Sequence, residues 1–195
     1  MMRVVNSLTL FYGEDDFLSN WYRCRFEVRG VRFNCAEQYL MYAEAKLFKD
    51  EAAASEILAT DHPRAQKVIG RRVKNFNEAI WHTRAEAIMT AGLYEKFRQN
   101  PPLESMLIAT MGTELVEASA SDTIWGAGLA LTDNDILDKT KWRGENRLGN
   151  CLMSVRHRIY HGITFVERVR SSQEVRAFTG AFSDGQIRTI RDLSQ

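Results

Sequence analysis

The stretch Tyr22-Arg-Cys-Arg-Phe-Glu-Val-Arg-Gly-Val-Arg-Phe33 runs directly into Asn34-Cys-Ala-Glu-Gln-Tyr-Leu40, and the change of pattern between the two decides the fold class. In the first stretch Cys24, Phe26 and Val28 fall on one face, as in a strand with one buried side. Arg29-Gly30 then predicts a two-residue turn, and Val31–Phe33 predicts a returning strand. From Ala36 onward the apolar residues recur with a helical period. The chain is therefore expected to begin with short antiparallel strands and to continue in helices.

The remainder of the chain is mostly helical in pattern. Pro101-Pro102 is expected to end the longest helix, and the Gly, Asp and Asn content of residues 125–147 predicts a long loop. We expect helices over about 36–49, 51–59, 63–69, 77–99, 103–110 and 148–160, and further short strands over about 8–12 and 114–118. This order predicts a predominantly helical α+β fold, and the length predicts a single domain over residues 1–195.

Composition and charge narrow the class of protein. The chain is 45% hydrophobic and 26% charged, as is usual for a globular protein, and its net charge of +1 argues against an extended nucleic-acid or anionic membrane surface. Its N-terminus is too polar for a signal peptide, and no apolar run is long enough to span a bilayer. We therefore expect a soluble cytoplasmic protein. Its cysteines, Cys24, Cys35 and Cys151, lack a CxxC pair, which favours reduced thiols over disulfides or zinc.

Several common catalytic motifs are absent. No phosphate-binding GxxxxGK[ST] loop occurs, and Gly126-Ala-Gly128 does not lie between a strand and a helix as a dinucleotide fingerprint would. His157 and His161 have the spacing of the HExxH zinc motif, but Arg158 stands where that motif requires glutamate. The sequence therefore implies no metal and no cofactor.

Four clusters combine polar and aromatic residues at places that packing alone does not explain: Phe17–Trp21, Cys35–Tyr39, Asn75–Trp81, and Asp122–Gly128 together with Trp142–Gly149. In this order, over about residues 10–161, they resemble the NADAR family, whose best-known member type is the YbiA N-glycosidase. The most specific parts are Glu37-Gln-Tyr39, Asp122 to Gly128 and Trp142-Arg-Gly-x-Asn-x-Leu-Gly149.

This resemblance implies a YbiA-like fold and hydrolysis of the N-glycosidic bond of ribose phosphates. Two substrate classes follow from it, namely early intermediates of riboflavin biosynthesis and ADP-ribose attached to guanine in nucleic acid. A non-catalytic module that binds ADP-ribose or NAD is a third interpretation. The expected partner is a small-molecule ribose-phosphate or ADP-ribose substrate, with ADP-ribosylated nucleic acid as an alternative and no membrane, while the oligomeric state is not predicted.

Glu37 is the residue on which this function depends. Breaking a bond between ribose C1′ and a nitrogen develops positive charge on the sugar, which a nearby carboxylate stabilises. The resemblance places Glu37 in the catalytic motif, where it would stabilise that charge or deprotonate the attacking water. The local pattern Asn34-x-x-Glu37 equally matches a capping box, in which Glu37 would bond to the backbone N–H of Asn34. The two interpretations do not exclude each other.

Supporting residues are expected from the same motifs and from the chemistry of the side chains. Asp122 is the second catalytic candidate, holding the ribose hydroxyls or assisting the water, and its alternative is to cap a turn. Trp125 is expected to stack on a base or to fill the core, and Trp81 has the same two alternatives. Arg71, in the basic pair after Gly70, is the candidate phosphate ligand, with a solvated helix end as its alternative. The remaining substrate-binding candidates are Ser19, Asn20, Gly126 and Asn146, whose alternative is hydrogen bonding within loops.

Two parts of the chain depart from the compact YbiA type. Between Gly126 and Asn146 the loop is longer and resembles the longer-loop branch of the family, so we expect it to cover the substrate and to affect which leaving group fits. Residues 163–195 lie outside the resemblance and form an unassigned C-terminal extension.

Overall fold

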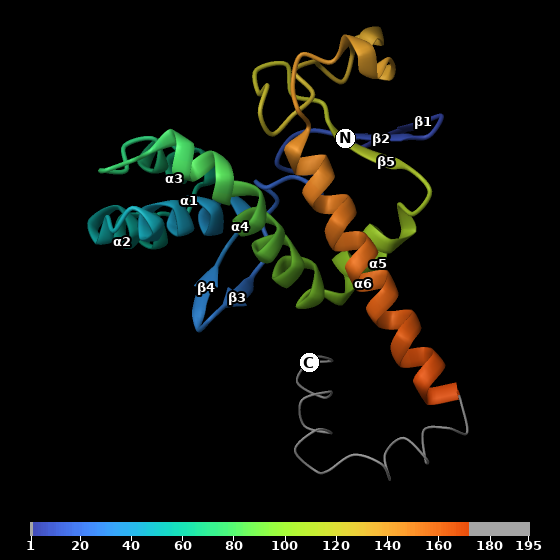
Figure 1. The fold of residues 1–195 in the computed structure, drawn as a ribbon, viewed down its shortest axis with the longest axis horizontal. Helices are drawn as coiled ribbons and strands as arrows, with labels where there is room; N and C mark the ends of the chain where they lie inside the picture. Colours follow the sequence, from blue (N-terminus) through green and yellow to red (C-terminus); the bar gives the residue numbers. More distant parts are fainter. Residues whose placement is uncertain (1, 172–195) are drawn as a thin grey trace. The chain divides into compact units, whose positions relative to one another are not determined.

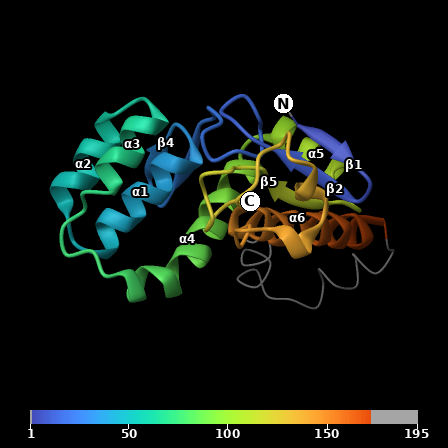
Figure 2. The same cartoon turned by 90° about the horizontal axis from the view of Figure 1, so that it is seen from above.

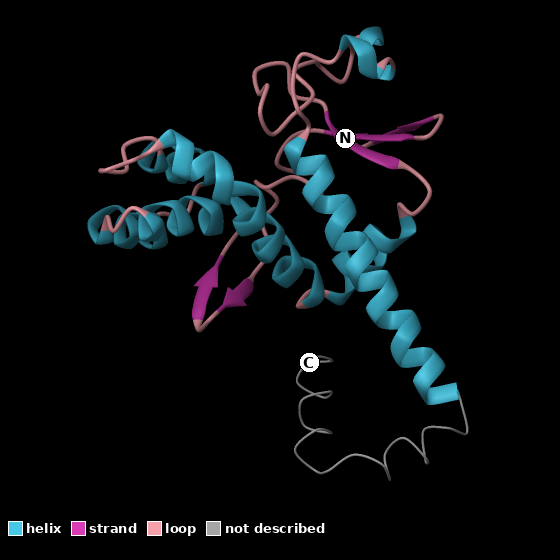
Figure 3. Ribbon diagram, viewed as in Figure 1, coloured by secondary structure: helices cyan, strands magenta, loops and turns pink. Residues whose placement is uncertain are grey.

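The computed structural model describes residues 2–171, with side chains up to Gly162, and helices dominate this part (Figure 3). The helices are α1 (Ala36–Leu47), α2 (Glu51–Ala59), α3 (Pro63–Gly70), α4 (Glu78–Arg98), α5 (Pro101–Ala109) and α6 (Arg147–Ser171). The strands are β1 (Arg3–Val5), β2 (Leu8–Phe11), β3 (Phe26–Val28), β4 (Val31–Phe33) and β5 (Glu114–Glu117), and short 3-10 helices cover Asn134–Leu137 and Lys139–Lys141. The expected α+β, predominantly helical class is confirmed.

The strands form two small sheets. In the first, β2 lies antiparallel to β1 and parallel to β5, so that Phe11 stands opposite Glu117. The second is the expected hairpin of β3 and β4, whose turn residues Arg29 and Gly30 both have positive φ, as the tight turn requires. This hairpin is shorter than predicted, because regular pairing begins only at Phe26. The strand β1 was not predicted from the sequence.

The prediction for Pro101-Pro102 was only half right. The longest helix does end before them, at Arg98, but the prolines themselves begin α5 instead of preceding it. Proline suits the first helical turn, because its fixed φ is helical and its missing N–H would have no partner there. The helix expected from about residue 103 therefore starts at Pro101.

Helix α1 is the centre of the helical layer, where it packs against α2, α3 and α4 (Figures 1 and 2). Gly70 allows α3 to approach closely, because a Cβ added there would lie 2.1 Å from the sulfur of Met41 on α1. A side chain at this position would require the Met41 side chain to move. The close approach matters for function, since α3 carries the basic side chains described below.

The long loop packs on the first sheet. Leu129 and Ile136 are buried in a cluster with residues of β2 and β5, and Trp142 packs against the same cluster and donates its indole N–H to the carbonyl of Ile136 at 2.8 Å. None of residues 126–146 lines the cavities described in the next subsection. The expectation that this loop covers the substrate was therefore wrong, because its apolar side chains are used to complete a core.

Residues up to Arg156 form one compact unit, and those from His157 onward are assigned to a second. Of the second unit the structure describes the continuation of α6, and residues 172–195, which include most of the unassigned extension, lie outside the described residues. The single domain over residues 1–195 stays a prediction. No helix in residues 2–171 combines the length and apolar character that crossing a bilayer requires.

Candidate active site

Three neighbouring cavities share Lys67 and Arg71 and together form what we call the cleft. The central cavity, of about 300 Å³, is lined by Glu37, Glu117 and Asp122. The aromatic cavity has a volume of about 410 Å³ and the polar cavity about 810 Å³. Each shares further lining residues with the central cavity. These volumes are in the range that holds small ligands and cofactors.

Glu37 lies in the first turn of α1, and its side chain is almost completely buried at 3% exposure. Its Oε1 has no hydrogen-bond partner among the described residues. Burial raises the pKa of Glu37, and Asp122 raises it further, while Lys67, a hydrogen bond with the Trp21 side chain and Arg71 lower it. An unpaired oxygen of this kind costs stability, so its position at a cavity wall indicates a role outside folding.

The capping-box alternative for Glu37 is excluded by its neighbours. The N-cap of α1 is Cys35, whose sulfur accepts from the backbone N–H of Gln38. Gln38 in turn accepts from the backbone N–H of Asn34 at 2.8 Å, which is the bond expected of Glu37. Because Gln38 takes the capping role, the Glu37 carboxylate is left free to face the cavity.

Asp122 combines both of its predicted alternatives. Its Oδ1 accepts from the backbone N–H groups of Ile124 and Trp125, so it does shape the turn. Its Oδ2 lies 3.8 Å from the Nζ of Lys67 and is therefore directed toward the cations of α3. The same side chain thus fixes the loop and presents a carboxylate oxygen to the central cavity.

Glu117, the last residue of β5, is a third carboxylate in the central cavity and was not among the predicted site residues. Its Oε2 is buried and has no partner among the described residues. Burial and the nearby carboxylates Asp122 and Glu37 raise the pKa of Glu117 to about 8, against a lowering effect of Lys67.

Asn146 holds the backbone of β5 rather than lining the cleft. Its Oδ1 accepts from the N–H of Glu117 at 3.0 Å, and its Nδ2 donates to the carbonyl of Leu115 at 2.9 Å. With both amide groups used, and with 1% exposure, Asn146 is better suited to position Glu117 than to contact substrate. Its φ of 51° also fits asparagine, which tolerates the left-handed region.

Backbone hydrogen bonds join the stretch Asp122–Gly128 to the stretch Trp142–Gly149. Asn146 donates to Gly126, Arg147 to Ile124 and Leu148 to Trp125, each at 3.0–3.2 Å. Gly126 packs tightly, because a Cβ there would lie 2.9 Å from the carbonyl oxygen of Asp122. Gly126 does not line the cleft, so its contribution is to hold Asp122 and Trp125 in place.

Lys67 and Arg71 supply the positive charge of the cleft. Lys67 lies on α3 and Arg71, four residues later, is the C-cap of that helix with helical φ and ψ, so the two share one helix face, and both line all three cavities. Arg71, predicted as a phosphate ligand, is thus brought to the site, whereas its neighbour Arg72 makes an ion pair with Glu56. Lys67 was not predicted as a site residue, although its position four residues before Arg71 places both side chains on one face of a helix.

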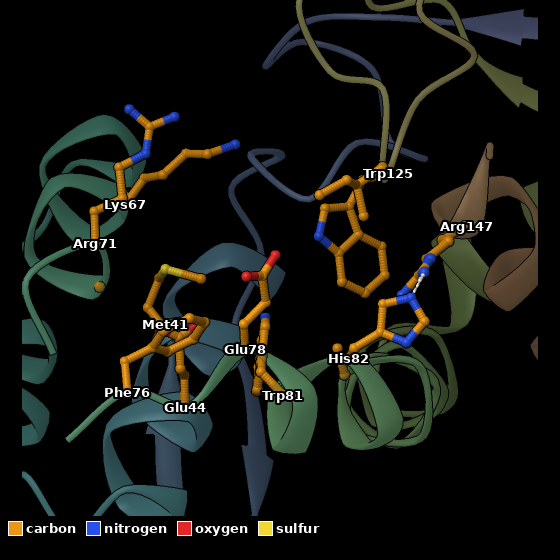
Figure 4. Close-up of a pocket in the computed structure, with 13 residues that line it drawn as sticks. Met41, Glu44, Lys67, Arg71, Phe76, Glu78, Trp81, His82, Trp125 and Arg147 are labelled. Carbon is orange, nitrogen blue, oxygen red and sulfur yellow. Dashed lines mark hydrogen bonds between the residues drawn. The ribbon is translucent and has the colours of Figure 1, made fainter. Parts of the chain in front are cut away.

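The aromatic cavity brings Trp81 and Trp125 together. In Figure 4 the cations of α3 lie across this cavity from Trp125, while His82 and Arg147 meet beside the indole. Arg147 donates to the ring of His82 at 2.5 Å. Glu44 also lines the cavity, and burial together with Glu37 raises its pKa to about 7. Both predicted tryptophans are therefore partly exposed in one apolar cavity and do not merely fill the core.

The loop with Ser19 and Asn20 is tied to the site from two directions. The carbonyl of Asn20 accepts from the backbone N–H of Glu37, and the ammonium of Lys96, with 0% exposure, donates to the carbonyls of Phe17 and Ser19 at 2.8 and 2.9 Å. Asn20 lines the central cavity with a buried, unpartnered Oδ1, and Ser19 lines the polar cavity. Both predicted residues are thus brought to the cleft.

The chain is similar to known proteins of one family. The model of the NADAR domain matches residues 10–160. N-glycosidase R617 of Acanthamoeba polyphaga mimivirus is 39% identical over 143 residues, which cover 71% of this chain and 84% of that protein. Riboflavin biosynthesis protein VVA0006 of Vibrio vulnificus is 29% identical over 168 residues, covering 82% of this chain and 42% of that protein.

A solved structure is similar as well. The NMR structure of the Escherichia coli protein YbiA superimposes with a TM-score of 0.67 at 26% sequence identity, and the match covers 87% of this chain and 92% of that one. The family match spans the loop of Asn20, helices α1 to α5 and the start of α6, and so includes the three carboxylates of the central cavity. The chain therefore belongs to the NADAR domain family.

Proposed function

We propose that this protein is an N-glycosidase that hydrolyses the bond between ribose C1′ and a base nitrogen in ribose-phosphate compounds such as early riboflavin-biosynthesis intermediates. The observation that carries the proposal is the buried, unpartnered Oε1 of Glu37 at the wall of a cavity that also holds Asp122 and Lys67. The names of the relatives R617 and VVA0006 support both the bond type and the substrate class.

The chemistry follows from the charge that the reaction develops. As the C1′–N bond breaks, the sugar becomes positively charged, and the carboxylate of Glu37 stabilises it from its buried position. Because the pKa of Glu37 is raised, this carboxylate also accepts a proton from the attacking water more readily than an exposed one would. Asp122 holds the ribose hydroxyls through the oxygen that faces Lys67.

The flanking cavities suit the two ends of such a substrate. The indoles of Trp81 and Trp125 offer flat surfaces for a heterocyclic base, an interaction worth about 1–3 kcal/mol. Arg71 and Lys67, at the junction with the polar cavity, provide the cationic donors that a phosphate needs. Ser19 and Asn20 add neutral hydrogen bonds next to Glu37.

Hydrolysis of ADP-ribose from guanine is the second candidate. The observation that favours it is the size of the polar cavity, about 810 Å³, together with its additional basic residues His62 and Arg64. A second phosphate and ribose would have room and charge partners there. A module that binds ADP-ribose without turnover is the third candidate, and the unpartnered carboxylate argues against it.

The decisive experiment gives the purified protein a ribosylaminopyrimidine phosphate and, separately, an oligonucleotide with ADP-ribosylated guanine. Free base and free sugar are followed by mass spectrometry for the wild type, Glu37→Gln and Glu114→Gln. Glu114, on β5, is the control, because this glutamate pairs with Lys139 and does not line the cleft. We expect Glu37→Gln to lose roughly 100- to 1,000-fold in kcat and Glu114→Gln to keep its rate. Equal rates for all three proteins, or tight binding of ADP-ribose without turnover by wild type, would refute the proposal.

A further inference from the structure

The central cavity contains one carboxyl group more than the mechanism above uses. Glu37, Glu117 and Asp122 all line it, and the cations that line it are Lys67 and Arg71. Three ionised carboxylates in one small cavity repel one another, and burial adds to the cost of charging each. One of the three is therefore expected to keep its proton near neutral pH, as in other sites where carboxyl groups share a cavity.

The surroundings single out Glu117 as the protonated member. Both carboxylate oxygens of Asp122 already have partners, because Oδ1 accepts two backbone N–H bonds and Oδ2 lies 3.8 Å from the Nζ of Lys67. Glu37 has Lys67 as its strongest charge partner, and Arg71 adds to it. For Glu117 the strongest charged neighbour is the carboxylate of Asp122, ahead of Lys67, and Glu37 adds further repulsion. The remaining titratable groups in the polar cavity, which Glu117 also lines, are Tyr12, Glu14, His62 and Arg64.

Glu117 is also held firmly enough to act in chemistry. Its backbone N–H donates to Asn146, and its carbonyl accepts from Ser119 and Ala127. The side chain is therefore presented from a fixed peptide at the end of β5, while its buried Oε2 has no partner among the described residues. A structural acid would be expected to bond to a neighbour, which this oxygen does not.

We propose that Glu117 is the general acid of the reaction, which gives its proton to the base nitrogen as the glycosidic bond breaks. The electron pair of the C1′–N bond goes to the nitrogen, which takes the carboxyl proton of Glu117 and leaves as the neutral base. Water then adds its oxygen to C1′ and gives one proton to the carboxylate of Glu37. Glu37 then releases its extra proton to solvent, and Glu117 takes a proton from solvent, so atoms and charge balance. This assignment rests on the N-glycosidase function proposed above.

The test compares leaving groups that differ in their need for a proton. An aminopyrimidine ribose phosphate requires protonation of the departing nitrogen, whereas a pyridinium ribose phosphate releases its base as a neutral pyridine without any. For Glu117→Gln we expect a loss of roughly 100- to 10,000-fold on the first substrate and less than about tenfold on the second. Glu114→Gln on the same strand serves as the matched control and is expected to retain both activities.

A pH profile gives an independent reading. The kcat/KM of the wild type for the aminopyrimidine substrate should fall above about pH 8, where Glu117 loses its proton, and this alkaline limb should be absent from the residual activity of Glu117→Gln. Equal losses on both substrates, unchanged rates, or an alkaline limb that persists in the variant would each overturn the assignment. These results leave the N-glycosidase function intact, whereas a wild type that releases no base from the aminopyrimidine substrate would overturn both proposals.

Discussion

Replacing Glu37 by glutamine should stabilise the protein while abolishing its activity. The substitution keeps the shape of the side chain and removes a buried charge whose Oε1 has no partner. Glutamine leaves a neutral polar atom in the same place, so the gain comes from the charge, because an unpaired buried charge costs more than the roughly 1–3 kcal/mol of an unpaired neutral group. We therefore expect the free energy of unfolding to rise by about 1–3 kcal/mol near neutral pH. For a chain of this size that corresponds to an increase of roughly 2–12 °C in Tm.

The gain in stability from Glu37→Gln should increase as the pH rises. Because burial raises the pKa of Glu37, the folded protein retains a proton that the unfolded chain has lost once the pH exceeds the ordinary value of 4.5. The wild type therefore loses stability as the pH rises above that value, and Glu37→Gln does not. Thermal unfolding followed by circular dichroism at about pH 4 and about pH 8 should show a small difference at the lower pH and the larger one at the higher.

The neighbouring residue provides the matched comparison. Gln38 caps α1 and donates to the carbonyls of Ile57 and Thr60, so Gln38→Ala should destabilise the protein by about 2–4 kcal/mol. If Glu37→Gln instead destabilised the protein to a similar extent, the carboxylate would be part of the folded framework. In that case Glu37 would not be reserved for chemistry.

Three further substitutions test the supporting residues. Asn146→Ala removes both bonds to β5 at a position with positive φ, and chemical denaturation should show a loss of about 2–4 kcal/mol. Burial lowers the pKa of Lys96 to about 8, so the folded protein loses this proton before the unfolded chain does, and the wild type should gain stability between about pH 8 and the ordinary lysine value of 10.5. Lys96→Met should lack this gain, as measured by urea unfolding at several pH values. Trp125→Ala should raise KM by roughly 5- to 100-fold with Trp125→Phe nearer to wild type, and equal steady-state constants for all three proteins would contradict stacking.

Much of the fold could be predicted because its signals are local. The turn at Arg29-Gly30 and the start of the longest helix at its N-cap Asn77 depend on neighbouring residues only. The strand β1 was missed because its three residues are largely exposed and acquire their structure by pairing with β2. The packing of the long loop was missed for the same reason, since the cluster that Trp142 packs against includes residues of β2 and β5, which lie far from it in the sequence.

Most of the predicted site residues came from motifs, whereas Arg71 was predicted from its basic pair after Gly70. The resemblance named Glu37, Asp122 and Trp125, all of which line the cleft. It did not distinguish residues that face the cleft from residues that hold others in place, as Asn146 and Gly126 do. That distinction requires knowing which amide groups are already bonded, and hydrogen bonds between residues 29 or 31 positions apart leave no local pattern.

The first turn of α1 shows how folding and chemistry are divided between adjacent residues. Cys35 and Gln38 satisfy the free backbone groups of the helix start, and the carbonyl of Asn20 takes the N–H of Glu37. With these bonds made by others, the only part of Glu37 without a folding role is its carboxylate. A capping box built from Glu37 itself would have stabilised the helix and removed the reactive group from the cavity. The glutamine after the glutamate therefore serves the site indirectly, because it accepts the Asn34 N–H bond that a capping box would give to Glu37.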